Sequence, residues 1–243
     1  ATQLASIVEA AARTQTPLLT TAGDSKWDWG RGLADTVHND RSLGHSTPTQ
    51  LNLSALSGIV DYEPSELVLV VGAATPLAQI EPLLTEQGQH LAFEPVHWRS
   101  TATAGGTVAV GLAGPRRFRA GSVRDFVLGL QFVDGKGRLV RSGGRVVKNV
   151  SGFDLWRGLT GSFGSLGLIT EVCFKLWPRP EAQCTLLFER PQLQAASRTM
   201  LQLAQRQEEI SGLAYVPTQG VVARLEGSAS ALQAQTETIA RDV

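Results

Sequence analysis

The chain has 243 residues, of which 42% are hydrophobic and 18% charged, a composition typical of an ordinary globular protein. Its 22 basic residues balance 22 acidic ones. The chain therefore has no net positive charge that would attract it to nucleic acid or to an anionic membrane surface. The two cysteines, Cys173 and Cys184, lie outside any C-x-x-C motif, which argues against a disulfide framework, zinc or iron–sulfur ligation. The chain also lacks a run of about 18 apolar residues. We therefore expect a cytoplasmic protein with no direct membrane insertion, reaching a membrane, if at all, through partner subunits.

The first half of the chain alternates helical and strand patterns. Apolar residues recur at helical spacing over residues 3–13, and PLLTT at 17–21 predicts a short strand. Residues 59–72 predict two strands separated by a turn, the second apolar enough to be buried on both faces. Thr75 then predicts the N-cap of a helix with proline at its first position, and Pro82 predicts a kink in that helix.

The second half predicts a hairpin, a long strand and a separate α/β unit. VLGLQFV and RLVRSGG flank the turn DGKG. The strand in GLITEVCFKLWP alternates, which predicts one apolar face with Cys173 on the polar side. After Pro180 the order is strand, helix, strand, strand, helix, which is one strand short of a ferredoxin-like unit. We therefore expect the native chain to continue beyond Val243.

The middle of the chain is rich in basic residues and glycine. Nine Lys and Arg against two Asp lie between Gly114 and Lys148, which suits a phosphate-bearing ligand, although solvated hairpin charge explains several of them equally well. Gly161 to Gly167 has the spacing G-x-x-G-x-x-G before a strand, so it is not a dinucleotide-binding motif of the Rossmann type, and the P-loop spacing fails too. The remaining pattern is a dispersed glycine set. Such a set suits a long ligand that lies against several backbone segments.

Five motifs occur in a fixed order over about residues 50–180: TAGG, GPRR, G-x-x-RD, VVKNVSGFDL and GSFGSLGLITE. This series resembles the FAD-linked oxidases of the vanillyl-alcohol oxidase superfamily, and within it the E-subunit group of glycolate oxidase (glycolate dehydrogenase). The resemblance implies an α+β fold, with a two-lobed PCMH-type FAD-binding domain followed by a partial ferredoxin-like cap domain. The FAD-binding domain would span residues 1–180, in lobes of about 1–93 and 94–180, and the cap 181–243.

The resemblance also implies where FAD binds. The pyrophosphate loop would be Ala22, Gly23, Asp24, Ser25 and Lys26. Relatives carry more glycine there, so Asp24 either repels the phosphates or turns outward to cap its own turn. The amides of Gly105 and Gly106, at the start of a helix, would face negative charge. The full set of other implied contacts is Pro95, Thr103, Ala104, Gly105, Gly106, Thr107, Ala109, Gly114, Arg116, Gly121, Asp125, Gly161, Gly164, Gly167 and Ile169.

Some implied roles stay open at this point. Lys148 and Asn149 either meet the flavin or a partner, or cap a turn before a short helix. The pyrophosphate loop has no histidine, so we expect FAD to be bound noncovalently. The sequence identifies no catalytic residue and predicts no metal site, because its histidines form no cluster with metal-ligand spacing. His97 could face the flavin, but a surface or core histidine is the simpler interpretation.

Three functional hypotheses follow. In the first, the chain is the FAD-binding subunit of a glycolate oxidase complex, beside a catalytic flavin subunit and an iron–sulfur subunit. In the second, it is a scaffold subunit of the same fold that binds FAD weakly or not at all. In the third, which is the least favoured, it is an autonomous FAD-dependent 2-hydroxy-acid dehydrogenase.

Overall fold

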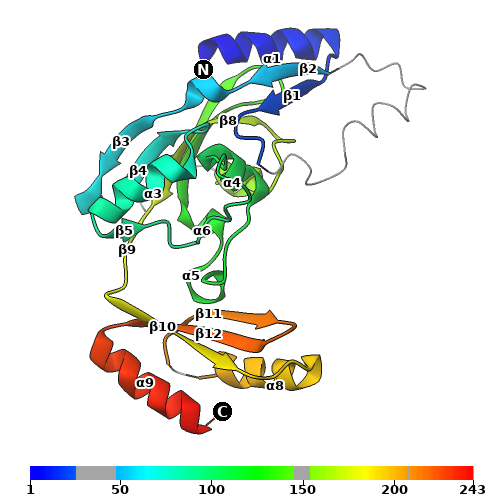
Figure 1. The fold of residues 1–243 in the computed structure, drawn as a ribbon. Helices are drawn as coiled ribbons and strands as arrows, with labels where there is room; N and C mark the ends of the chain where they lie inside the picture. The colour runs from blue at the N-terminus through cyan, green and yellow to red at the C-terminus, as the bar shows by residue number, and fades with distance from the viewer. Residues whose placement is uncertain (26–47, 145–153, 207, 243) are drawn as a thin grey trace. The chain divides into compact units, whose positions relative to one another are not determined.

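The computed structural model describes residues 1–25, 48–144, 154–206 and 208–242 (Figure 1). The chain divides into two compact units. Unit 1 consists of Ala1–Leu91, Pro95–Leu112 and Val123–Trp177. Unit 2 consists of Ala92–Glu94, Ala113–Ser122 and Pro178–Val243. Two short pieces from the middle of the chain therefore belong with its C-terminal part.

The main sheet of unit 1 has five antiparallel strands in the order β3-β4-β8-β6-β7. The predicted hairpin is confirmed: β6 and β7 pair, and the Asp134 carboxylate accepts hydrogen bonds from the amides of Lys136 and Arg138 in the turn. Strand β4 is buried along its whole length, as its apolar run predicts. The strands are β3 (Ile59–Glu63), β4 (Val68–Gly72), β6 (Val127–Val133), β7 (Leu139–Gly143) and β8 (Leu168–Lys175).

The prediction that β8 has one apolar face is wrong. Six of its eight residues are buried, and Cys173 lies in a cluster with Val68, Val70 and Leu128. The physical reason is its position, because β8 lies between β4 and β6 in the interior of the sheet. When both faces of an inner strand are covered, the side chains that point to either face are buried.

Helix α3 (Leu77–Glu86) begins later than predicted. Pro76 occupies the N-cap position, and Thr75 makes no cap. Instead the Thr75 hydroxyl accepts a hydrogen bond from the Gly58 amide at 2.9 Å and donates to the Gly72 carbonyl at 2.7 Å. It thus joins the start of β3 to the end of β4. The assigned helix continues through Pro82.

The other elements of unit 1 surround this sheet (Figure 1). Helix α4 packs against β4 and β8, and β1 pairs in parallel with β2. The helices are α1 (Thr2–Thr14), α4 (Ala104–Val110), α6 (Val123–Phe126) and α7 (Leu155–Leu159), and the 3-10 turns are η2 (Ser54–Leu56) and η3 (Pro64–Glu66). The short strands are β1 (Leu18–Thr21), β2 (Thr49–Asn52), β5 (Gln89–His90) and β9 (Trp177–Pro178).

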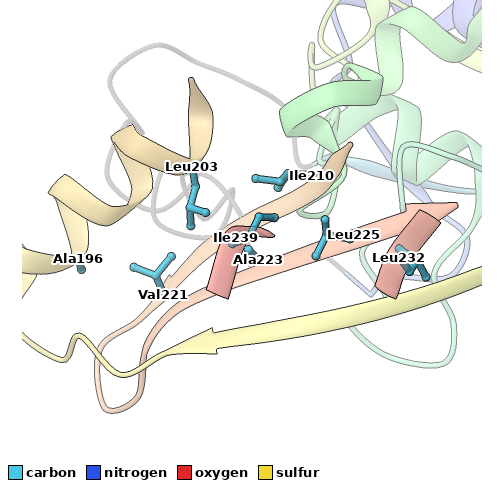
Figure 2. Packing of buried hydrophobic residues seen from close by; sticks show 8 residues of the cluster. All are labelled: Ala196, Leu203, Ile210, Val221, Ala223, Leu225, Leu232 and Ile239. Carbon is cyan, nitrogen blue, oxygen red and sulfur yellow. The ribbon is translucent and has the colours of Figure 1, made fainter. Parts of the chain in front are cut away.

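Unit 2 has the predicted order of strand, helix, strand, strand and helix. Its antiparallel sheet has the order β10-β12-β11, and α8 and α9 pack against it. Figure 2 shows core side chains from both helices and two of the strands: Ala196, Leu203, Ile210, Val221, Ala223, Leu225, Leu232 and Ile239. The elements are α5 (Arg117–Ala120), β10 (Ala182–Phe188), α8 (Leu193–Ala204), β11 (Ile210–Val216), β12 (Gly220–Gly227) and α9 (Ala229–Asp242).

Within the described ranges, every helix is too short or too polar to cross a membrane.

Candidate functional site

The loop after β1 carries the residues predicted to bind the FAD pyrophosphate. Asp24 is exposed, has a positive φ of 48°, and accepts a hydrogen bond from the Ala22 amide at 3.0 Å. This is the turn-capping alternative for Asp24, and it occupies an amide that a phosphate would otherwise use. Ser25 is buried at the end of the loop. Lys26 lies outside the described residues.

Gly23 brings this loop against the segment before α4. A Cβ at Gly23 would lie 1.7 Å from the Thr101 carbonyl oxygen and 2.9 Å from Cγ2 of Thr103. Only glycine allows so close an approach between two backbones. Two of the predicted FAD-binding segments, far apart in sequence, therefore lie side by side in unit 1.

The first turn of α4 uses its amides within the protein. Thr103 caps the helix, with its Oγ1 accepting from the Gly106 amide at 3.3 Å. The Gly105 amide donates to the Ala73 carbonyl at 2.7 Å, and the Ala104 amide donates to the Thr75 carbonyl at 2.9 Å. The amides of Gly105 and Gly106 thus both have acceptors inside the protein, and their predicted role beside a negative charge stays a prediction.

The two glycines at this turn serve different purposes. A Cβ at Gly105 would lie 2.7 Å from the Cβ of Ala73, so this glycine allows α4 to pack against the end of β4. A Cβ at Gly106 would meet only the Thr103 hydroxyl, at 3.1 Å. Gly106 is thus less crowded than Gly105, and its absent side chain keeps the helix backbone accessible beside the Thr103 cap.

The end of α4 brings in a third predicted segment. Gly161 donates its amide to the Val108 carbonyl at 3.0 Å, and Phe163 donates to the Ala109 carbonyl at 2.8 Å. A Cβ at Gly164, whose φ is 76°, would meet nothing within 4 Å. The loop after β1, α4 and the 161–164 segment are therefore connected through direct contacts within unit 1.

Two buried hydroxyls test whether these segments fit a polar ligand. Oγ1 of Thr107 and Oγ of Ser162 are buried, and neither has a hydrogen-bond partner among the described residues. Thr107 is only 1% exposed. A buried hydroxyl without a partner is unfavourable, and a bound ligand is one way to satisfy it. Together with the open space at Gly164, these groups fit FAD, whose many acceptor atoms would satisfy them.

Three further predicted residues, Gly114, Arg116 and Gly121, lie in unit 2, and Arg116 belongs to a network of charged side chains. Arg116 is buried, and its guanidinium pairs with Glu226 on β12 and lies 3.9 Å from Oε1 of Glu94. Arg224 completes the set, 2.6 Å from Glu94 and 3.2 Å from Glu226. We call these four residues the charge quartet. Its two positive and two negative groups neutralise each other, so the charge of Arg116 is already balanced within the protein.

The electrostatics of the quartet favour the ionised form of Glu94. Burial of the Glu94 carboxyl acts to raise its pKa, but hydrogen bonds and charges from Arg224 and Arg116 outweigh this and lower the pKa below its ordinary value of 4.5. Burial lowers the pKa of Arg116, and the carboxylates of Glu226 and Glu94 oppose that effect. Buried charges are tolerated when they are paired in this way.

The backbone around the quartet is fixed as well. The Arg116 amide donates to Oε2 of Glu94 at 2.6 Å, and a Cβ at Gly114 would lie 2.7 Å from the Cβ of Glu94. Gly121 has a φ of 101°, which favours glycine. Gly114 and Gly121 are thus explained by packing and turn geometry, and an additional role in FAD binding stays a prediction.

The remaining predicted residues are scattered. Pro95 is half-buried, Asp125 on α6 is exposed, and Ile169 is buried in β8. Gly167 allows packing, since its Cβ would lie 2.9 Å from Phe132. Lys148 and Asn149 lie outside the described residues.

His97 is a surface residue that pairs with a carboxylate. Its Nε2 lies 2.8 Å from Oε1 of Glu81 on α3, and each side chain is about 40% exposed. No group of three or more His, Cys, Asp or Glu side chains among the described residues could hold a metal ion.

Sequence reasoning missed three members of the quartet, Glu94, Arg224 and Glu226. Glu94 is 130 residues away from Arg224 in sequence, and no periodicity links them. One available signal was the alternation in VVARLEG on β12, where Val221, Ala223 and Leu225 face the core and Arg224 and Glu226 fall on the opposite face. Two charges of opposite sign on one face of a strand indicate partners on a neighbouring segment.

Comparisons with known proteins agree with this geometry. The family described as "FAD binding domain" matches residues 1–143. The chain is 41% identical over 225 residues to "Glycolate oxidase subunit GlcE" of Escherichia coli (strain K12), covering 93% of this chain and 60% of the relative. It is 31% identical over 147 residues to a D-lactate dehydrogenase of Archaeoglobus fulgidus, covering 60% of this chain and 33% of the relative.

A solved structure gives the same fold. Alkyldihydroxyacetonephosphate synthase superposes with a TM-score of 0.69 at 15% identity, covering 97% of this chain and 47% of that protein. The chain thus spans 60% or less of the length of these relatives. The family match and the identity to its relatives show that this chain belongs to the FAD-binding domain family, with FAD as its cofactor.

Proposed function

We propose that this chain is the FAD-binding subunit of a complex that oxidises a 2-hydroxy acid, with glycolate as the first candidate substrate. The observation that carries the proposal is the 41% identity across 93% of the chain to the glycolate oxidase subunit of Escherichia coli. Other relatives are named D-lactate and D-2-hydroxyglutarate dehydrogenases. The substrates in these names share one chemical group, a hydroxyl beside a carboxylate.

The reaction removes two electrons from the carbon that bears the hydroxyl. The C–H bond breaks with transfer of a hydride, the hydroxyl loses its proton, and a 2-oxo acid is formed. Bound FAD supplies the hydride acceptor for this chemistry. The residues proposed to hold FAD are the segments that unit 1 brings together: Ala22–Ser25, Thr103–Ala109 and the loop from Gly161 to Gly164. We propose that FAD binds to them noncovalently.

We propose that the complex also contains a catalytic flavin subunit and an iron–sulfur subunit. The names of two relatives support a multi-subunit assembly, since both are called subunits of a glycolate oxidase.

We also propose how the chain divides into domains. Residues 1–180 would form the FAD-binding domain and residues 181–243 part of the cap domain. The sheet order β10-β12-β11 supports the second half of this proposal, since it is the ferredoxin-like order without its fourth strand.

The second candidate function, a scaffold subunit with weak FAD binding, has specific support. The Ala22 amide is occupied by Asp24, and the first-turn amides of α4 are bonded to protein acceptors. Fewer amides thus remain to hold the pyrophosphate than in a glycine-rich loop.

A single preparation distinguishes the candidates. The full chain is purified, its flavin spectrum is recorded before and after adding FAD, and glycolate is then titrated anaerobically with and without the partner subunits. The proposal expects near-equimolar flavin that glycolate reduces only when the partners are present. Failure to take up added FAD favours the scaffold, and reduction of the flavin in the chain alone favours an autonomous dehydrogenase.

A further inference from the structure

Unit 2 contains a surface cleft that the FAD contacts proposed above do not explain. The cleft has a volume of about 580 Å³ and lies between the 113–118 segment and strand β11. Its described lining consists of Ala113, Gly114, Pro115, Arg117, Phe118 and Leu213. One cation therefore stands beside an otherwise uncharged and mainly apolar surface. This combination suits a small molecule with a carboxylate at one end and an apolar group at the other.

The three arginines of this segment are used differently. Arg116 points into the charge quartet, and Nη2 of Arg119 donates to the carbonyls of Arg206 at 3.2 Å and Glu208 at 3.4 Å. Arg117 lies between them, is exposed, and makes no ion pair with any described residue. Two of the three guanidinium groups thus bond to other residues of unit 2, and the third belongs to a residue that lines the cleft.

Neighbouring carboxylates do not compete for Arg117. Glu94 and Glu226, which belong to the quartet, are each bound by Arg116 and Arg224. Because the quartet carries no net charge, the positive charge of Arg117 is left to act on a ligand.

The backbone holds Arg117 in place. Its amide donates to the Gly114 carbonyl at 3.0 Å, and the Gly114 amide donates in turn to the carbonyls of Phe93 and Glu94. On the opposite wall, a Cβ at Gly212 of β11 would lie 3.3 Å from the Cβ of Pro115. The cleft is therefore formed before a ligand arrives, which lowers the cost of binding.

We propose that Arg117 binds the carboxylate of a 2-hydroxy acid with an apolar side chain, and that Phe118 and Leu213 contact that side chain. The inference rests on the proposed function, because the substrate class comes from there. A guanidinium matches both oxygens of a carboxylate. The cleft is larger than glycolate requires, and its apolar wall has nothing to contact in glycolate. Acids with a longer side chain should therefore bind more tightly.

Calorimetric titration of the purified full chain tests this directly, with glycolate, lactate, 2-hydroxyisocaproate and 2-hydroxyisocaproamide as probes. We expect affinity to rise along the three acids, and Arg117→Met to weaken binding of 2-hydroxyisocaproate about ten- to a hundredfold. Arg117→Lys should weaken binding of 2-hydroxyisocaproate less than Arg117→Met does. The amide should bind the wild-type chain about as weakly as the acid binds Arg117→Met. The matched control is Arg198→Met, an exposed arginine on α8, which should leave every Kd unchanged.

Three results would overturn the proposal: an unchanged Kd for Arg117→Met, an equal loss in Arg198→Met, or equal affinity for the amide and the acid. Bound FAD is measured in the same samples, so the two proposals fail separately. If the purified chain takes up no FAD but still binds the acid through Arg117, the result contradicts the proposed function and leaves this inference standing. If the chain takes up FAD but its affinity for the acid does not depend on Arg117, the result contradicts this inference and leaves the proposed function standing.

Discussion

At the scale of single residues, Thr107 offers the most direct test of the proposed FAD site. Its hydroxyl is buried on α4 with no partner among the described residues, whereas the Thr170 hydroxyl, buried to a similar degree, donates to the Gln131 carbonyl at 3.1 Å. Comparing the two threonines therefore tests whether the Thr107 hydroxyl contributes to binding of FAD.

Replacement of Thr107 by valine should make FAD bind about tenfold more weakly while the apo chain stays as stable as before or gains about 1 kcal/mol. The reason is that a buried hydroxyl without a partner costs free energy in the apo protein, and its removal costs a hydrogen bond only when FAD is present. Fluorescence titration with FAD and thermal unfolding of the apo chain measure the two effects. Thr170→Val, the control, should lower apo stability by about 1 kcal/mol. Equal FAD affinity in wild type and Thr107→Val would contradict the assignment.

A second pair of substitutions distinguishes packing from ligand access at the start of α4. Gly105→Ala should destabilise the apo chain by about 1–3 kcal/mol, because the new Cβ would lie 2.7 Å from Ala73. Gly106→Ala should change apo stability less than Gly105→Ala, since the new Cβ would meet only the Thr103 hydroxyl, at 3.1 Å, and alanine favours helix, but it should weaken FAD binding. Chemical denaturation and FAD titration give both numbers. A stable Gly105→Ala chain would show that the packing of α4 is looser than described.

At the scale of elements, the quartet connects β12 to the 92–94 and 113–122 segments of unit 2. Its ionisation makes the stability of unit 2 depend on pH. Since folding lowers the pKa of Glu94, ionised Glu94 stabilises the native state above its unfolded value near 4.5, and this stabilisation is lost as the pH falls through the lower, folded pKa.

We therefore expect Glu94→Gln to lower the free energy of unfolding by about 3 kcal/mol at pH 7, because Arg224 and Arg116 lose a partner. The variant should also lose less stability than the wild type when the pH is lowered below about 4.5. Denaturant unfolding across pH measures both effects. Glu237→Gln changes an exposed carboxylate on α9 and should behave like wild type. Parallel pH curves for Glu94→Gln and wild type would refute the assignment.

Elements explain what the sequence could and could not predict. The hairpin of β6 and β7 and the order of elements in unit 2 depend on local patterns, and both follow from the sequence. The burial of Cys173 depends on which strands flank β8, and the cap at Thr75 is lost to a competing hydrogen bond from Gly58. The motifs locate the predicted FAD segments, but the use of the Gly105 amide by Ala73 cannot be inferred from them.

At the scale of the whole molecule, the proposed FAD contacts of the pyrophosphate loop, α4 and the 161–164 loop all lie in unit 1, and the quartet and cleft lie in unit 2. Saturating FAD at about a hundred times its Kd should stabilise the chain by about 2.7 kcal/mol. Hydrogen exchange should slow most in residues 103–109 and 161–167, with β11 and β12 nearly unchanged. Equal protection of β11 and β12 would contradict a site confined to the unit 1 segments.

The interleaving of the two units has a consequence for biosynthesis. Unit 2 takes three residues at Ala92–Glu94 and ten at Ala113–Ser122 before its main stretch begins at Pro178. On a translating ribosome, Glu94 and Arg116 leave the exit tunnel long before Arg224 and Glu226 exist. Glu94 and Arg116 can meet each other early, but both lack their partners on β12 until that strand emerges. Completion of unit 2 is therefore a late event of synthesis, whatever the speed at which unit 1 folds.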